Sequence, residues 1–293
     1  MFKARNFVPE PMDKKKSKRH WPWVAYSTNN KVDNVKVSIL MPSFRQGKYL
    51  EEAIRSVLCS PHHNLELIIL DGGSDDESVN ILEYYSESIK FWASEKDSGQ
   101  SHALSKALSH ADGDLIGWLN SDDLYTPDAI FSAVSSYKIG YTCSYGDRIL
   151  INKNSEMIGW SRRGAYNPHV YAYNIASETF FWNKSVKAQF DISFQFAMDV
   201  DFISRILLKE KIHYSKNFRG CFRCHEDSKS TKIHQVGAME ADKVYQNLFN
   251  HAMPKLNSPH PFGKWGMFLD LLNFPFKIGI PFLKHKSCHR SSI

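Results

Sequence analysis

The chain has 293 residues, of which 42% are hydrophobic and 23% are charged, and this is the composition of a folded globular protein. Its formal net charge is +6, and much of the excess lies in two basic runs at 14–19 and 284–290. Because these runs are not arrayed along a recognition helix, they disfavour nucleic acid as a partner. Five scattered cysteines indicate a reducing compartment. The first residues lack the apolar core of a secretory signal and no long apolar span occurs, so we expect a cytoplasmic protein without a membrane-spanning helix.

An irregular arm, basic and then aromatic, is expected over residues 1–34. Beyond it, apolar β-branched runs alternate with segments of helical spacing. We expect strands at 35–41, 65–70, 89–93 and 115–119, with helices at 49–58, around 79–85 and at 100–109. This alternation predicts an α/β fold with a mostly parallel central sheet flanked by helices.

Acidic residues follow three of these expected strands. Asp71 follows the second strand, Asp97 the third, and Asp122 with Asp123 the fourth. Since ligands of open α/β sheets bind outside the carboxyl ends of the strands, these acids predict one crevice. Adjacent carboxylates suit Mg²⁺ or Mn²⁺ carrying a phosphate, and the alternative is a solvated, Asp-rich turn. Neither a GxGxxG fingerprint nor a Walker loop is present, which disfavours a dinucleotide oxidoreductase.

The pattern changes beyond residue 140. Strands are expected at 141–145 and 149–152 around a turn at Gly146 and Asp147, and further strands at 178–182, 212–214 and 218–222. Asp199 lies in the first turn of an expected helix. The last sixty residues are expected to be helical and broken by prolines.

Five segments, in this order and spacing, match a known family. They read SILMPSF from residue 38, LDGGSDD from 70, EKDSGQSHAL from 95, GDLIGWLNSDD from 113 and MDVDF from 198. The chain therefore resembles the glycosyltransferase family 2 enzymes, which are inverting and have a GT-A fold. The segment RCHEDSKS from 223 resembles a late segment of the same family.

The resemblance implies a domain organisation and a set of site residues. It implies a GT-A catalytic domain at 35–235, with a nucleotide-sugar half at 35–140 and an acceptor half at 141–235. Residues 236–293 are not covered by the resemblance and are expected to form a helical extension. It implies Asp199 as the catalytic base and Asp122 with Asp123 as the metal ligands. The residues that it places at the nucleotide sugar are Pro42, Ser43, Asp71, Asp97, Lys106, Ser121 and Asp122.

The chemistry of an inverting transfer requires the same residue types. A carboxylate must deprotonate the acceptor hydroxyl, and the departing diphosphate must be neutralised. Asp199 would need basicity from its placement or from neighbouring Asp201, and the alternative is that it only caps a helix. The family motif often reads Asp-x-Asp-Asp, and here Asn120 stands at its first position.

The expected activity is hexosyl transfer from a nucleoside-diphosphate sugar, a UDP-sugar, to a saccharide or lipid-linked acceptor, with Mn²⁺ or Mg²⁺. The alternatives are a nucleotidyltransferase and an inactive GT-A module that binds nucleotide sugars or glycans.

Two other signals compete with these expectations. Cys221, Cys224 and His225, with His213 or His234, have the residue types of a zinc site, although the cysteine spacing also fits a strand. The apolar segment 265–283, followed by basic residues, is expected either to pack on the domain or to contact an anionic membrane surface. The second alternative would place the protein peripherally on the inner face of the cytoplasmic membrane.

Overall fold

A computed structural model of the chain describes residues 8–12, 21–23, 34–162, 175–226, 228 and 234–249. In the first half, strands and helices alternate as expected. The elements are β1 (Val37–Ser43), α1 (Gly47–Leu58), β2 (Leu65–Asp71), α2 (Ser78–Tyr84), β3 (Phe91–Ser94), α3 (Gln100–Ser109) and β4 (Leu115–Trp118). Every residue of β1 is buried, as a central parallel strand covered on both faces requires.

The second half supplies short strands and the remaining helices. The elements are β5 (Leu124–Tyr125), α4 (Ala129–Lys138), β6 (Cys143–Asn152), β7 (Met157–Ser161), the 3₁₀ turn η4 (Ser177–Thr179), β8 (Phe181–Asn183), α5 (Met198–Leu207), β9 (Ile212–Cys224) and α7 (His234–Phe249). A second 3₁₀ turn, η2 (Ser86–Ser88), precedes β3.

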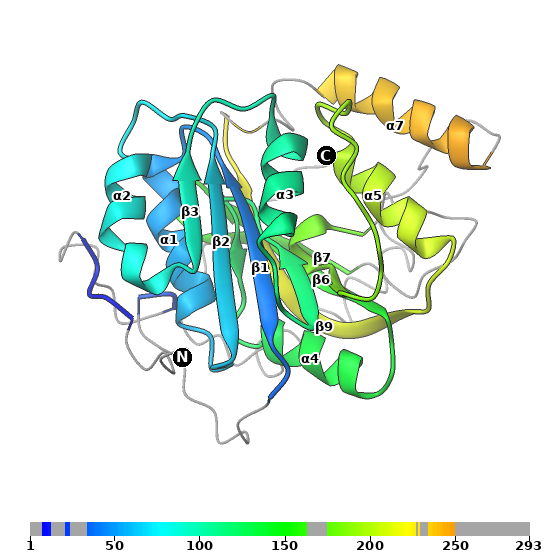
Figure 1. The fold of residues 1–293 in the computed structure, drawn as a ribbon, viewed down its shortest axis with the longest axis horizontal. Coiled ribbons are helices and arrows are strands. Elements are labelled where there is room, and N and C mark those ends of the chain that lie inside the picture. Colours follow the sequence, from blue (N-terminus) through cyan, green and yellow to red (C-terminus); the bar gives the residue numbers. More distant parts are fainter. Residues whose placement is uncertain are drawn as a thin grey trace.

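All the strands belong to one mixed sheet, in the order β3-β2-β1-β4-β8-β6-β9-β5, with β7 paired to β6. The strands β3, β2, β1 and β4 are parallel, so the expected parallel sheet is found in the first half. From β8 onward most pairings are antiparallel, and β6 and β9 run parallel to each other. Figure 1 shows the sheet between two layers of helices.

The prediction of a turn at Gly146 and Asp147 is wrong, because β6 runs through both residues. A Cβ at Gly146 would lie 2.4 Å from the Asn217 carbonyl oxygen, so this glycine allows close contact with β9 rather than a reversal. The gap expected between 214 and 218 is likewise absent. There β9 continues through two register shifts relative to β6, and Lys216, within the first of them, has φ 54°. Segment 178–182 is a strand only from Phe181, because η4 precedes it.

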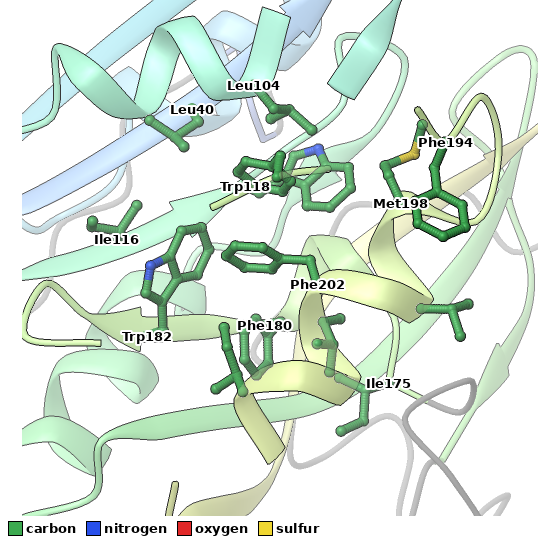
Figure 2. Close-up of a cluster of buried hydrophobic side chains, with 14 of the residues drawn as sticks. Leu40, Leu104, Ile116, Trp118, Ile175, Phe180, Trp182, Phe194, Met198 and Phe202 are labelled. Atoms are coloured by element: carbon green, nitrogen blue, oxygen red, sulfur yellow. The ribbon is translucent and has the colours of Figure 1, made fainter. Parts of the chain in front are cut away.

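Two apolar cores cover the faces of the sheet. One joins β1 residues such as Ile39 to α1, α2 and α4. The other joins Leu40 to α3, α5 and α7, and it includes Trp118, Trp182 and Phe202. In Figure 2 the ring of Phe202, from α5, lies between Trp118 and Trp182. The strand that leads to the acid pair is therefore packed against α5, where Asp199 lies.

The N-terminal arm contacts α1 where it is described. Arg55 of α1 donates to the carbonyl oxygens of Pro9 at 2.6 Å and Trp23 at 3.1 Å. The Trp21 indole donates to the carbonyl oxygen of Tyr125 at 2.9 Å. The two basic runs and segment 265–283 lie outside the described residues. Within the described part of the chain, no helix is long and apolar enough to cross a membrane.

Candidate active site

The ends of β1, β2 and β3 bring the first group of predicted site residues together. Ser43 pairs with Asp71, and Asp71 in turn pairs with Ser94, so the three residues lie at one level. Asp71 is 1% exposed, and it accepts hydrogen bonds from Ser94 Oγ at 2.7 Å and from the Ser74 amide at 2.8 Å. This carboxylate fixes the turn that follows β2. Pro42 is buried one position earlier in β1.

Asp97 joins this group through the loop after β3. A Cβ on Gly72 would lie 3.3 Å from both carboxylate oxygens of Asp97 and 3.3 Å from Cδ2 of Phe44, so only a glycine lets these side chains approach so closely. Asp97 also accepts a hydrogen bond from the Gly99 amide at 2.8 Å, at the start of α3. Phe44 is 54% exposed and was not among the predicted residues. Its only signal in the sequence is an aromatic side chain directly after a strand end.

The acid pair after β4 divides into two different environments. Asp122 is partly exposed, and its Oδ2 lies 3.0 Å from Nε2 of His225. Asp123 is 1% exposed and accepts hydrogen bonds from the Arg223 amide at 2.9 Å and from the Asn120 amide group at 3.3 Å. Burial, then the Asp122 carboxylate and a nearby glutamate, raise the pKa of Asp123 well above its usual range.

The geometry thus pairs Asp122 with His225 rather than with Asp123. Among the described side chains, no group of three His, Cys, Asp or Glu residues converges on one point. A carboxylate oxygen and an imidazole nitrogen are nevertheless donors that Mn²⁺ accepts, and phosphate and water oxygens can complete its coordination. Metal binding by Asp123 itself stays a prediction. Ser121, between Asn120 and this pair, is 3% exposed.

Arg223 anchors the acid pair and was not predicted. Its fully buried guanidinium donates to the Asp122 carbonyl oxygen at 2.7 Å, to Glu52 of α1 at 2.8 Å and to Ser155 at 2.8 Å. The partners come from three distant parts of the chain. A local sequence pattern therefore could not indicate this role.

Lys106 is not brought to the other predicted site residues. It lies on α3 and pairs with Glu95, and both side chains are substantially exposed. The link between α3 and the acid pair is made instead by Asn120, whose side-chain oxygen accepts from Gln100 at 2.7 Å and from the Trp118 indole at 2.8 Å.

Asp199 is the second residue of α5 and is half-buried. Its Oδ1 accepts a hydrogen bond from the Val200 amide at 2.9 Å. Burial is the main cause that raises the pKa of Asp199 to about 6, and the Glu178 carboxylate adds to it, whereas Arg148 acts in the opposite direction. Asp201 does not contribute, because Arg205 binds both of its oxygens at 3.0 and 3.1 Å. The basicity of Asp199 therefore comes from its placement.

Glu178 connects the acid pair electrostatically with Asp199 and was missed by the sequence reasoning. It is 2% exposed, and its Oε1 lies 3.5 Å from the Arg148 guanidinium. The side chain crosses β9 at Gly220, where a Cβ would lie only 2.3 Å from Cγ of Glu178. Its charge contributes to the raised pKa values of both Asp123 and Asp199.

The start of α3 is hydrogen-bonded both to the loop of the acid pair and to the segment before α5. Gln100 binds Asn120 of the acid loop, and Ser101 Oγ donates to the carbonyl oxygen of Phe194, just before α5, at 2.8 Å. Hydrogen bonds from the start of α3 therefore link the loop that carries the acid pair to the segment that leads into α5.

The cysteine pair lies in a strand, as one of the two alternatives predicted. Cys221 and Cys224 both belong to β9, where residues three apart point to opposite faces. Cys221 is buried between strands, and Cys224 is half-buried.

The Rossmann-like mixed sheet flanked by helices, with acids at its strand ends, is a GT-A fold. Solved structures show the same fold: TarS of S. aureus with UDP-GlcNAc has a TM-score of 0.56 at 16% identity over 73% of this chain and 67% of that one. A mannosyltransferase of Pyrobaculum calidifontis, in complex with GDP-Man and Mn²⁺, has a TM-score of 0.55 at 13% identity over 78% of this chain and 67% of that one.

The sequence model of Glycosyl transferase family 2 matches residues 38–207, and the chain belongs to this family. An uncharacterised glycosyltransferase of Mycobacterium tuberculosis is 28% identical over 78% of this chain and 86% of its own length. WfgD of Escherichia coli, a UDP-Glc:alpha-D-GlcNAc-diphosphoundecaprenol beta-1,3-glucosyltransferase, is 32% identical over 42% of this chain and half of its own length. The protein is a glycosyltransferase, and the nucleotidyltransferase alternative is set aside.

Proposed function

We propose that the protein transfers a hexose with inversion from a UDP-sugar to a saccharide or lipid-linked acceptor of the cell envelope. The observation that carries the proposal is Asp199, a half-buried carboxylate in the first turn of α5 whose pKa is raised to about 6. A group with this pKa is ionised at neutral pH and still basic enough to assist proton removal. The substrates named for WfgD and the UDP-GlcNAc complex of TarS support the donor and acceptor classes.

The donor would lie along the strand ends. Pro42, Ser43, Asp71 and Asp97 would line the nucleoside, with Ser121 and Asp122 toward the diphosphate. We add Phe44, because its exposed ring beside Asp97 offers a face on which a base can stack. Lys106 as a phosphate contact stays a prediction, which would require it to leave Glu95.

Asp122 and His225 would hold a divalent metal ion, Mn²⁺ or Mg²⁺, together with oxygens of the diphosphate. When bound, the ion would neutralise charge on the departing diphosphate. Asp123 supports this site through Arg223 and Asn120, and its replacement should disturb it as well.

In the reaction, Asp199 accepts the proton of the acceptor hydroxyl as that oxygen attacks the anomeric carbon. The bond from the anomeric carbon to the diphosphate oxygen breaks on the opposite face, and UDP leaves. Residues 35–140 would form the donor half and 141–235 the acceptor half.

Asp199→Asn tests the base assignment. Transfer should fall by at least about 10³-fold, while the affinity for UDP with Mn²⁺ stays within twofold. Asp201→Asn is the matched control, since it removes one charge from the same helical turn and should keep its activity. Wild-type transfer by Asp199→Asn would refute the role of Asp199 as the base, and a wild-type protein without transfer would favour the inactive module.

Membrane contact through the C-terminal segment remains part of the proposal, because a lipid-linked acceptor lies at a membrane surface. Flotation with anionic liposomes should recover the full chain but not a chain without residues 260–293. Equal recovery of the two forms would contradict this contact.

A further inference from the structure

Glu240, on α7, holds the chain just before the helix that carries Asp199. Its Oε2 accepts hydrogen bonds from the amides of Phe196 at 2.8 Å and Ala197 at 2.9 Å, and its Oε1 accepts from the amide of Gln195 at 3.0 Å. Three consecutive backbone donors are thus bound by one carboxylate from a distant part of the chain.

The three amides that Glu240 binds lie directly before the helix, because Ala197 is the N-cap residue and α5 begins at Met198. A carboxylate at this end is favoured by the helix dipole and forms charge-assisted hydrogen bonds. Glu240 therefore fixes the backbone path of 195–197, and with it the position of Asp199 two residues later.

The placement of α7 is set by close packing. A Cβ on Gly237 would lie 2.2 Å from the ring of Phe196, so the backbone of α7 rests directly on that ring. Three further α7 residues, Ala241, Val244 and Tyr245, belong to the same core as Met198. Figure 1 shows α7 running beside α5.

The segment held by Glu240 also adjoins the start of α3, next to Asp97. The carbonyl oxygen of Phe194 accepts a hydrogen bond from Ser101 of α3. The side-chain oxygen of Gln195 approaches Gly99, within 3.4 Å of the position of a Cβ there. Gly99 in turn donates to Asp97.

We propose that Glu240 is a positioning residue for the transfer reaction, which acts by holding segment 195–197 so that Asp199 faces the donor crevice. This inference rests on the proposed role of Asp199. It assigns a function to α7, which lies beyond the 38–207 range of the family match.

Glu240→Gln tests the inference, because the amide keeps one acceptor oxygen but presents an N–H group where the second oxygen stood. We expect kcat to fall by about 10- to 100-fold, as for a displaced catalytic group, while KM for the donor changes less than twofold. Glu240→Asp keeps both acceptors on a shorter arm and should recover part of the loss. Asp242→Asn is the matched control, because it removes the same charge from the same helix at a carboxylate that accepts from Gln246 on the surface.

Gly237→Ala tests the same inference by disturbing the packing of α7 on Phe196 instead of the hydrogen bonds of Glu240. Alanine raises the helix propensity of α7 yet collides with Phe196, so kcat should fall although the helix itself is favoured. Hydrogen–deuterium exchange of the amides at 195–197 should be faster in Glu240→Gln and Gly237→Ala than in wild type and Asp242→Asn.

Faster exchange with unchanged kcat in Glu240→Gln would overturn the inference and leave the base assignment intact. An equal loss of donor affinity and kcat would also overturn it, since that result indicates general disruption. Transfer by Asp199→Asn would instead refute the base, whatever the Glu240 variants do. If Glu240→Gln does not fold, Glu240→Asp and Gly237→Ala carry the same test.

Discussion

A base must be ionised to accept a proton, and at Asp199 burial and the Glu178 carboxylate raise the pKa to about 6. The ionised fraction therefore rises with pH through this value, and kcat should fall tenfold for each unit below about pH 6. The measurement is kcat at saturating donor and acceptor across the acidic range. A kcat that stays flat from about pH 7 to pH 5 would contradict the role of Asp199 as the base.

Two nearby charges shift the pKa of Asp199 in opposite directions, so removing each one should have an opposite effect. Glu178 raises the pKa of Asp199 and Arg148 lowers it, so Glu178→Gln should move the acidic limb of the kcat profile to lower pH and Arg148→Met should move it to higher pH. Shifts of about half a unit or more are expected. If the acidic limb moves in the same direction in both variants, changes in packing rather than charge determine the pKa of Asp199.

For single residues, the sequence predicts the placement of side chains whose position depends on the local chain. Asp71, Asp97 and Asp122 can be predicted because each follows a recognisable strand, and the ends of parallel strands meet at one edge. Glu178 and Arg223 could not be predicted, because one acts by crossing β9 at Gly220 and the other by joining α1 to the acid loop. Those contacts depend on the order of the strands in the sheet, which local sequence patterns do not reveal.

At the opposite edge of the sheet, the amino ends of the strands are joined by buried Glu66. Its Oε2 lies 2.7 Å from the ammonium group of Lys36 and 3.0 Å from that of Lys90. Burial alone would raise the pKa of Glu66, but hydrogen bonds from Lys36, Ser38, the Asp112 amide and Lys90 outweigh it and lower the pKa.

Glu66→Gln should lower the free energy of unfolding by about 2 kcal/mol, because it removes the buried carboxylate from two partly buried ammonium groups, which keep the exposed carboxylate of Asp112. A lowered pKa means that the stabilisation is complete above the unfolded value and is lost as pH falls through the folded value. Urea unfolding at pH 7 and at pH 3 should therefore show a smaller difference between variant and wild type at the lower pH. A constant difference would contradict this role.

The 3₁₀ turn η4 packs closely against β9 at Gly220, because glycine has no side chain that would separate them. Gly220→Ala would place Cβ 2.3 Å from Cγ and 2.9 Å from the carbonyl oxygen of Glu178, so η4 or β9 must move. We expect a loss of about 2–3 kcal/mol of stability, together with reduced transfer. Gly159→Ala on β7 is the control, because its Cβ would find ordinary contact at 3.6 Å from Leu150.

Helices with a regular spacing of apolar residues can be predicted, whereas the full length of strands that contain glycine and polar residues cannot. The expected helix at 100–109 coincides with α3, whereas β6 and β9 were each expected as two strands. Polar residues and glycine inside a strand normally indicate a turn. Here they are accommodated because β6 and β9 pair in parallel with a register shift opposite Gly146.

For the whole molecule, the apolar core beneath the crevice does not end where the family match ends. It joins Leu40 of β1 and Phe202 of α5 to Val244 of α7. The border expected between 235 and 236 falls inside α7, whose range begins at His234. A helix in this part of the chain could be predicted, but the docking of α7 on α5 could not, because that contact depends on the tertiary positions of Glu240 and Gly237.

This continuity predicts that a chain ending at residue 233 is less stable than one ending at residue 250. The shorter chain loses α7 and exposes the surface that covers Ala241, Val244 and Tyr245, each at most 1% exposed in the complete fold. Burial of these side chains contributes about 4–6 kcal/mol, so the chain ending at 233 should unfold at a clearly lower temperature. Calorimetry compares the two forms. Equal unfolding temperatures would show that α7 adds no stability, whereas a single transition in the longer chain and a lower one in the shorter would establish α7 as part of the catalytic domain.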